Sequence, residues 1–125
     1  MTSSDFRVRR RWVGPVHVIT PTGALDSAST AAMTEATAAA LRRARSVVVD
    51  LSAVTSMEAE VAHLLAELAE QAHACRGRLR VAALPEHAHR LFAQLELYEV
   101  LGGRGDVATE CRSAISHLAG THQRR

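Results

Sequence analysis

The chain has 125 residues, of which 47% are hydrophobic, and its formal net charge is +2. This length and apolar content suit one domain with one core and argue against two domains. All 15 basic residues are arginines, and their only run of three, at residues 9–11, is too small a patch to predict nucleic-acid binding. No apolar run reaches the roughly 18 residues that span a bilayer, and the N-terminus lacks the apolar segment of a signal peptide. We therefore expect a cytoplasmic protein without membrane insertion.

The spacing of apolar residues predicts alternating strands and helices. Residues 47–49 form a β-branched run typical of a strand buried on both faces of a sheet, whereas Val61, Leu65 and Leu68 share one face of a helix. In chain order we expect strands at 6–12 and 16–19, a helix at 28–43, a strand at 46–51, a polar turn, a helix ending near 75, a strand at 79–83, a helix from 85, a brief strand at 100–101 and a helix ending near 118. Helices that return the chain between strands make those strands parallel. The sequence thus predicts a single α/β domain, with its core at about residues 8–119 and a mixed sheet of about four to five strands with about four helices.

Polar residues and a glycine mark the ends of the predicted helices. Asp26 or Ser27 is a suitable N-cap for the first helix, and Asp106 or Thr109 for the last one. Gly77 is placed to close the second helix. We expect the tail at residues 120–125 to be flexible.

The junction between the buried strand and the second helix is where we expect the function to lie. It consists of Thr55, Ser56, Met57, Glu58, Ala59, Glu60 and Val61. Thr55 and Glu58 match the capping-box pattern T-x-x-E, which offers a purely structural explanation for half of the junction. Glu60 has no capping role. Glu58 and Glu60 are two residues apart, so on a helix they point to different sides and do not form an acid–base pair.

No set of residues predicts catalysis. The histidines at positions 63, 73, 87 and 89 lack the i,i+3 or i,i+4 spacing of a helical metal pair. No serine lies in a G-x-S-x-G elbow, and the glycine-rich residues 102–105 lack the Lys-Ser/Thr of a phosphate-binding loop. We therefore expect a protein that is not an enzyme, with no catalytic residue, no metal and no cofactor.

Two interpretations of the cysteines are open. Cys75 and Cys111 both lie on apolar helical stripes, which predicts buried free thiols that act as small hydrophobic side chains. Alternatively, the two thiols approach within disulfide range and form a redox pair that alters binding at the junction.

Three motifs follow one another along the chain. Residues 23–26 are G-A-L-D, residues 47–57 combine an apolar run with D-L-S, and residues 91–101 contain an L-x-L pattern that leads to Val-Leu. In this order and spacing they resemble the STAS domain family (sulphate transporter and anti-sigma factor antagonist). The resemblance covers about residues 8–119 and implies the same α/β fold.

The resemblance also implies a site and a partner. In the anti-anti-sigma branch of the family, the loop contains D-S-S-G, and an anti-sigma factor that is also a kinase phosphorylates the second serine. Glu58, Ala59, Glu60 and Val61 stand at these four positions here. The implied partner is thus an anti-sigma factor of histidine-kinase-like ATPase type, bound through Asp26 and residues 55–61. Glu60 replaces the phosphorylated serine, so switching at that position is absent; its single charge mimics only part of the about −1.5 to −2 of a phosphoserine.

Alternatives remain within the same resemblance. STAS domains also serve as subunits of ABC-type lipid transport complexes and of stress-signalling complexes, and the altered phosphorylation loop is compatible with such a constitutive subunit. Ser56 or Thr55 is a candidate for a displaced phosphorylation site. A homodimer formed through the edge of the N-terminal strand is a further open alternative.

Overall fold

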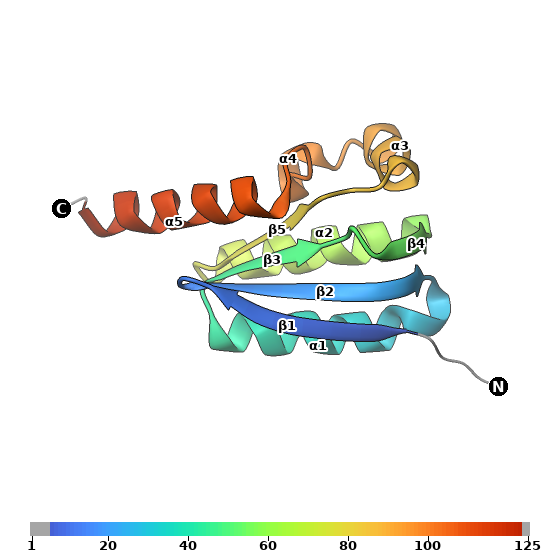
Figure 1. Ribbon diagram of the computed structural model, residues 1–125, viewed down its shortest axis with the longest axis horizontal. Coiled ribbons are helices and arrows are strands. Elements are labelled where there is room, and N and C mark those ends of the chain that lie inside the picture. The colour runs from blue at the N-terminus through green and yellow to red at the C-terminus, as the bar shows by residue number, and fades with distance from the viewer. Residues whose placement is uncertain (1–5, 124–125) are drawn as a thin grey trace.

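The computed structural model describes residues 6–123 and, within that range, the side chains of residues 6–118. It contains one five-stranded sheet with helices on both faces (Figure 1), so the predicted mixed α/β fold is confirmed. The strands are β1 (Arg7–Val13), β2 (Val16–Leu25), β3 (Ser46–Asp50), β4 (Val54–Met57) and β5 (Arg78–Ala82). The helices are the 3-10 turn η1 (Ser27–Ser29) and α1 (Thr30–Arg43), α2 (Ala59–Ala74), α3 (Glu86–Leu95), α4 (Tyr98–Leu101) and α5 (Val107–Gln123).

The longest strand, β2, organises the sheet. It pairs antiparallel with β1 along most of its length. On its other side, it pairs parallel with β3 through residues 16–19 and with β4 through residues 23–25. The register shifts between Gly23 and Ala24, where Gly23 has a φ of +112° that side chains rarely allow. β2 therefore carries β3 at one end of the molecule and β4 at the other.

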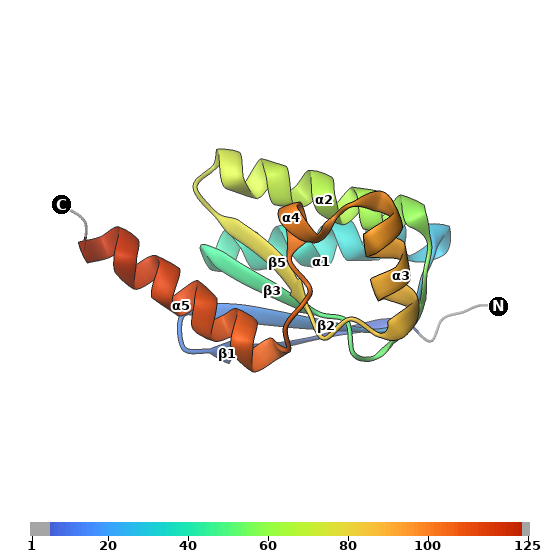
Figure 2. The same cartoon turned by 90° about the horizontal axis from the view of Figure 1, so that it is seen from above.

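The helices form a layer on each face of the sheet (Figure 2). α1 and α2 lie on one face, and α5 lies on the other. Successive residues of a strand point to opposite faces, so Ile19 joins the larger core beneath α1 and α2, whereas Val18 joins the smaller core beneath α5. Cys111 and Ala114 of α5 complete the smaller core. As predicted from its β-branched run, β3 is buried along its whole length.

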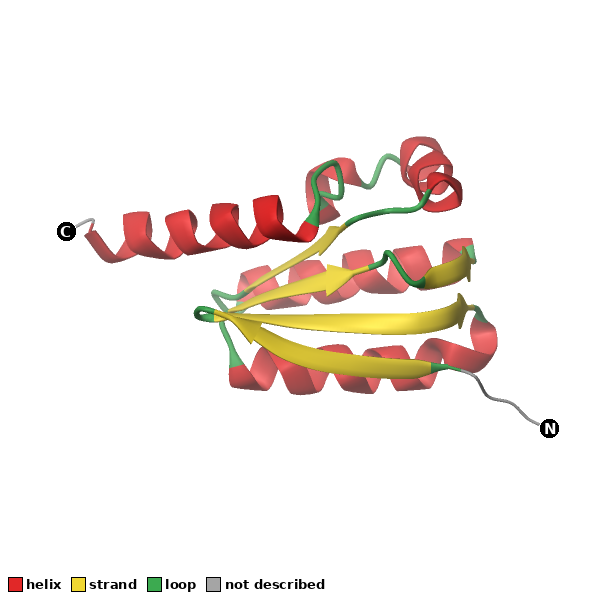
Figure 3. Ribbon diagram, in the orientation of Figure 1, coloured by secondary structure: helices red, strands yellow, loops and turns green. Residues whose placement is uncertain are grey.

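Two predicted elements are wrong in type. Residues 54–57, expected within a polar turn, form the short strand β4 beside the end of β2 (Figure 3). Backbone pairing with β2 overrides the turn-like sequence, because strand preference depends strongly on context. The brief strand expected at Val100–Leu101 is instead the end of α4, and the sheet contact there is an isolated bridge between Val81 and Gly102.

The helix ends differ in detail from the predictions. Asp106 caps α5, since Thr109 N donates to Asp106 Oδ1 at 2.8 Å. α5 continues beyond the predicted end near residue 118 to Gln123, and the rest of the predicted flexible tail, residues 124–125, lies outside the described residues. At the end of α2, the left-handed backbone belongs to Arg76, with a φ of +66°, and not to Gly77. Gly77 permits close packing instead, because a Cβ there would lie 3.3 Å from two carbonyl oxygens.

Candidate partner-binding site

The junction is built where two neighbouring parallel strands end. Leu25 of β2 is in register with Met57 of β4, and Glu58 N donates to Leu25 O at 2.8 Å. Asp26 and Glu58 directly follow these two strands, so the chain brings them to the same edge of the sheet although they are 32 positions apart. Carboxyl ends of parallel strands are common binding positions because loops there can be varied without disturbing the sheet.

Asp26 holds the start of the first helix. Its Oδ1 accepts hydrogen bonds from Ala28 N at 3.1 Å and Ser29 N at 3.3 Å, and Asp26 N donates to Ser29 Oγ at 2.9 Å. This reciprocal capping box confirms the prediction of Asp26 as an N-cap, although it opens the turn η1 that precedes α1. The half-buried Asp26 therefore has a structural role in addition to any contact with a partner.

Most of the junction is accessible. Thr55, Ser56, Glu58, Ala59 and Glu60 are exposed, and Met57 is half-buried against the larger core. We use the name junction surface for these six residues together with Asp26.

Val61 does not belong to this surface. Its side chain is 0% exposed and packs in the larger core, so the expectation that it contacts a partner is wrong. The helical period explains this position, because Val61, Leu65 and Leu68 share the face of α2 that lies against the sheet.

The capping-box explanation for Thr55 and Glu58 is also wrong. Thr55 lies within β4, and Glu58 is the N-cap of α2 without any hydrogen bond from its side chain to the helix. Neither side chain is thus engaged in capping the start of α2. Glu60 lies in the first turn of α2, where the positive end of the helix dipole favours a carboxylate.

Two buried or half-buried side chains support the junction from behind. Asp50 Oδ1 accepts a hydrogen bond from Ser52 N at 3.0 Å, which fixes the turn between β3 and β4 and explains the D-L-S motif. His87 on α3 lies with its Nε2 3.2 Å from Val54 O, so it is not simply a surface histidine. No signal in the sequence pairs His87 with Val54, because the contact joins positions 33 residues apart.

The charge of the junction surface is uncompensated. Among the side chains of residues 6–118, the ion pairs are Arg80 with Glu110 and Arg90 with Glu86. Asp26, Glu58 and Glu60 thus contribute carboxylates at one end of the molecule with no arginine paired to them. Such a surface is complementary to a basic patch on another protein.

Among the side chains of residues 6–118, no three His, Cys, Asp or Glu residues are grouped as a metal site. No helix within residues 6–123 is long and apolar enough to cross a bilayer.

The two cysteines are not brought together. Both are free thiols, and Cys111 is buried beneath α5 as predicted, whereas Cys75 is exposed at the end of α2. Because α2 and α5 lie on opposite faces of the sheet, the alternative of a redox pair is not supported (Figure 2). The apolar stripe of α2 ends before Cys75, since that residue is the C-cap.

The sequence matches the family model described as "Mlab, STAS domain" over residues 8–102. The chain therefore belongs to the STAS domain family, as its three motifs indicated. Comparison with curated proteins finds no match.

Several solved structures share the fold. An anti-sigma factor antagonist from Mycobacterium paratuberculosis is 16% identical, with 87% of this chain and 93% of that chain covered and a TM-score of 0.74. The anti-sigma factor antagonist SpoIIAA in its unphosphorylated form is 14% identical, with coverages of 91% and 97% and a TM-score of 0.67. The Bacillus cell fate determinant SpoIIAA in its phosphorylated form is 14% identical, with coverages of 86% and 99% and a TM-score of 0.64.

Proposed function

We propose that this chain is a non-enzymatic regulatory protein that binds an anti-sigma factor through the junction surface. The observation that carries the proposal is the placement of Asp26 beside residues 55–60 at the ends of two parallel strands, where all but Met57 are exposed and the carboxylates form no ion pair with a described side chain. Solved relatives in fold are anti-sigma factor antagonists, and one of them has been solved both with and without phosphorylation, which supports a regulatory role. The proposed partner is an anti-sigma factor of histidine-kinase-like ATPase type.

Glu60 gives this proposal its specific form. It is exposed in the first turn of α2, at the position that the family resemblance assigns to the phosphorylated serine. A carboxylate accepts no phosphoryl group there, so binding would not be switched at residue 60. Its single charge and planar carboxylate would reproduce a phosphoserine only in part.

A matched pair of variants tests the surface. We expect Glu58→Gln/Glu60→Gln to weaken binding of the purified ATPase-type partner, because it removes two exposed carboxylates from the junction surface. Glu67→Gln/Glu70→Gln removes the same charge from exposed positions further along α2 and should leave the affinity unchanged. Equal affinities of both variants and the wild-type protein, measured by calorimetry, would contradict the proposed surface.

A gain-of-function variant tests the switch. With ATP and the partner kinase, Glu60→Ser should incorporate radioactive phosphate on the hydroxyl that the substitution introduces, whereas the wild-type protein should not be labelled. Labelling of the wild-type protein at Thr55 or Ser56, mapped by mass spectrometry, would instead identify a displaced phosphorylation site.

A second candidate function keeps the surface and changes the partner. The chain would then be a STAS subunit of an ABC-type lipid transport complex or of a stress-signalling complex. The absence of a phosphorylatable residue at position 60 favours a subunit that is always bound. Copurification with an ATPase and a permease from the native cells would support this candidate, and copurification with a histidine-kinase-like ATPase would support the first.

A further inference from the structure

Arginines gather at the end of the molecule opposite the junction surface. There α1 and α2 end and β3 and β5 begin (Figure 1). The basic end, as we call it, consists of Arg42, Arg43, Arg45, Arg76 and Arg78, which line two hollows that share Gly77 and Arg45. No carboxylate lines either of these two hollows, whereas an adjoining hollow that Arg78 also lines contains Glu70 and Glu99. None of these five arginines forms an ion pair with another described side chain. The arginines that look dispersed in the sequence therefore form one patch.

The backbone around Gly77 fixes the two turns that carry these arginines. Arg78 N donates to Arg45 O at 2.7 Å, and Gly77 N donates to Ala72 O at 2.6 Å. Any Cβ at Gly77 would crowd Ala72 O and Arg45 O, so the glycine lets the turn after α1 approach the turn after α2. These hydrogen bonds consequently hold the backbone of Arg45 next to that of Arg76 and Arg78.

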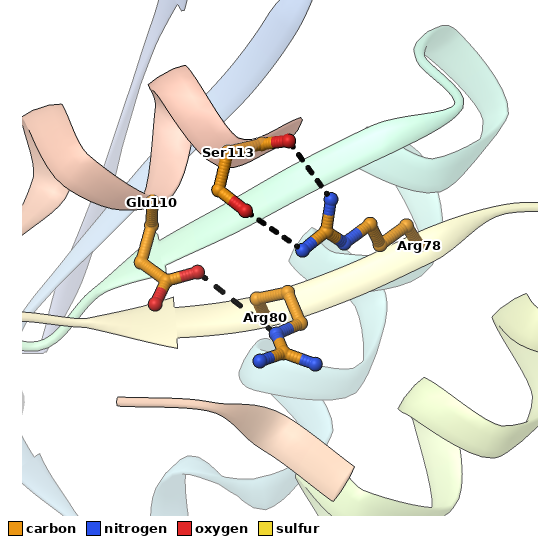
Figure 4. Close-up of polar contacts among 4 residues, drawn as sticks. All are labelled: Arg78, Arg80, Glu110 and Ser113. Carbon is orange, nitrogen blue, oxygen red and sulfur yellow. Dashed lines mark hydrogen bonds and ion pairs between the residues drawn. The ribbon is translucent and has the colours of Figure 1, made fainter. Parts of the chain in front are cut away.

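Arg78 is a half-buried cation without an anionic partner (Figure 4). Its guanidinium lies 3.4 Å from both Ser113 O and Ser113 Oγ, which are neutral acceptors. Burial, and next the like charge of the neighbouring Arg80, lower the pKa of Arg78, while Glu110 acts in the opposite direction. Glu110 itself forms an ion pair with Arg80, in which Arg80 Nε lies 3.9 Å from Glu110 Oε1. An anion close to such a group favours its charged form.

The hollow in front of Arg78 is large enough for more than an ion. Its volume is about 470 Å³, and its lining includes Arg45, Arg76, Arg78, His73 and His117. Ser46 also lines it; that side chain is 1% exposed, and its hydroxyl has no hydrogen-bond partner among the described residues. Cavities of about 300–1,000 Å³ are the usual size for small-molecule ligands.

Helix dipoles explain only part of this arrangement. Arg42 and Arg43 lie in the last turn of α1, where a cation offsets the negative helix end. Arg78 lies on a strand, and its side chain contacts α5, so the same argument does not apply to it.

We propose that Arg45, Arg76 and Arg78 form a binding site for the phosphate group of an anionic ligand, with Ser46 and the two histidines lining the remaining space. Guanidinium groups bind phosphate through paired hydrogen bonds, and three of them from two linked turns surround one hollow here. This site lies at the opposite end from the junction surface and is independent of the proposed partner.

The test is an NMR titration of the full chain with inorganic phosphate at constant ionic strength, with sodium chloride as the compensating salt. We expect saturable shifts of the amide signals at residues 45–46 and 76–78. Arg45→Gln/Arg78→Gln should bind phosphate at least about tenfold more weakly. The loss of a single hydrogen bond to a charged group is already enough to raise the Kd by about that factor. Arg7→Gln/Arg9→Gln removes the same charge from exposed positions on β1 and should bind as the wild-type protein does.

Further measurements separate the outcomes. Arg76→Gln alone, at an exposed side chain, repeats the test if the double variant fails to fold as judged by circular dichroism. Flotation with phosphatidylglycerol vesicles, against phosphatidylcholine vesicles, distinguishes a lipid headgroup from a soluble phosphate compound as the source of the group. Arginine-dependent binding to either probe supports the site. Two NMR results count against the site: shifts that do not saturate, and a β1 control that binds as weakly as the double variant. Either of them, combined with vesicle binding that does not depend on these arginines, would overturn the proposal.

Discussion

His17 is a buried histidine with no polar partner. Its side chain is 2% exposed, and neither ring nitrogen has a hydrogen-bond partner among the described residues. The ring of Trp12, which is itself half exposed, lies edge-on with its centroid 4.5 Å from that of His17. Burial first, and then the positive charges of Arg10 and Arg43, lower the pKa of His17 below its usual 6.5. The folded protein therefore favours the neutral imidazole more strongly than the unfolded chain does.

This residue makes stability depend on pH. As the pH falls below about 6.5, the unfolded chain takes up a proton at His17 before the folded chain does, so the free energy of unfolding decreases, by at most about 1.4 kcal/mol per pH unit for one proton. We expect that in His17→Leu the free energy of unfolding, measured with urea between pH 7.5 and 5, decreases less steeply as the pH falls than it does in the wild-type protein. His63→Gln, at an exposed histidine, should leave the wild-type slope, and the same slope in all three proteins would show that His17 is not responsible.

At the scale of elements, β4 is the strand with the fewest residues paired in the sheet. It has four residues and pairs with β2 alone, through Gly23, Ala24 and Leu25. Gly23 N donates to Ala53 O at 3.2 Å from a backbone conformation with positive φ. The strand that positions the junction surface thus depends on one glycine of its neighbour.

Gly23→Ala should loosen this pairing. The strained φ costs about 1–3 kcal/mol for a residue with a side chain, so we expect a loss of that size in the free energy of unfolding and weaker binding of a junction partner. Thr22→Ala, at the exposed preceding position, should change stability by about 0.5 kcal/mol or less. Chemical denaturation followed by circular dichroism measures both, and equal effects of the two changes would refute the role given to Gly23.

The sequence predicts elements well where local signals and burial agree. The β-branched residues 47–49 predict β3, and Asp26 and Asp106 predict the starts of two helices, because capping needs only neighbouring residues. Local signals do not predict β4, because its pairing partner lies about 30 positions away in β2. The basic end escapes prediction for a similar reason, since Arg45 and Arg78 meet only when two turns are bonded together. The spacing of residues 55 and 58 imitates a capping box, although both side chains are exposed and neither caps the helix.

At the scale of the whole molecule, the small net charge conceals two places where charges of one sign gather. Carboxylates without ion-pair partners lie at the junction, and arginines lie at the opposite end and along β1. β1 is an edge strand on which Arg7, Arg9, Arg10 and Arg11 are all exposed. Like charges on an edge oppose pairing with a second copy of the same strand.

The homodimer that the sequence left open should therefore not form through β1. We expect the wild-type chain to sediment as a monomer at micromolar concentration, most clearly at low salt, where repulsion is least screened. Arg9→Thr/Arg11→Thr should self-associate more readily, because it removes two of the charges from the strand edge. A wild-type dimer that persists at low salt in analytical ultracentrifugation would contradict this.

The double-sided pairing of β2 also determines how the protein opens. Its amides are enclosed by β1 on one side and by β3 and β4 on the other, so hydrogen exchange in the first half of β2 requires the sheet itself to come apart. β4 has no strand on its outer side, and its amides can exchange through a local opening that leaves β3 and β5 in place. Deuterium uptake would thus divide the molecule into a slow frame around β2 and β3 and a faster corner that carries the junction surface.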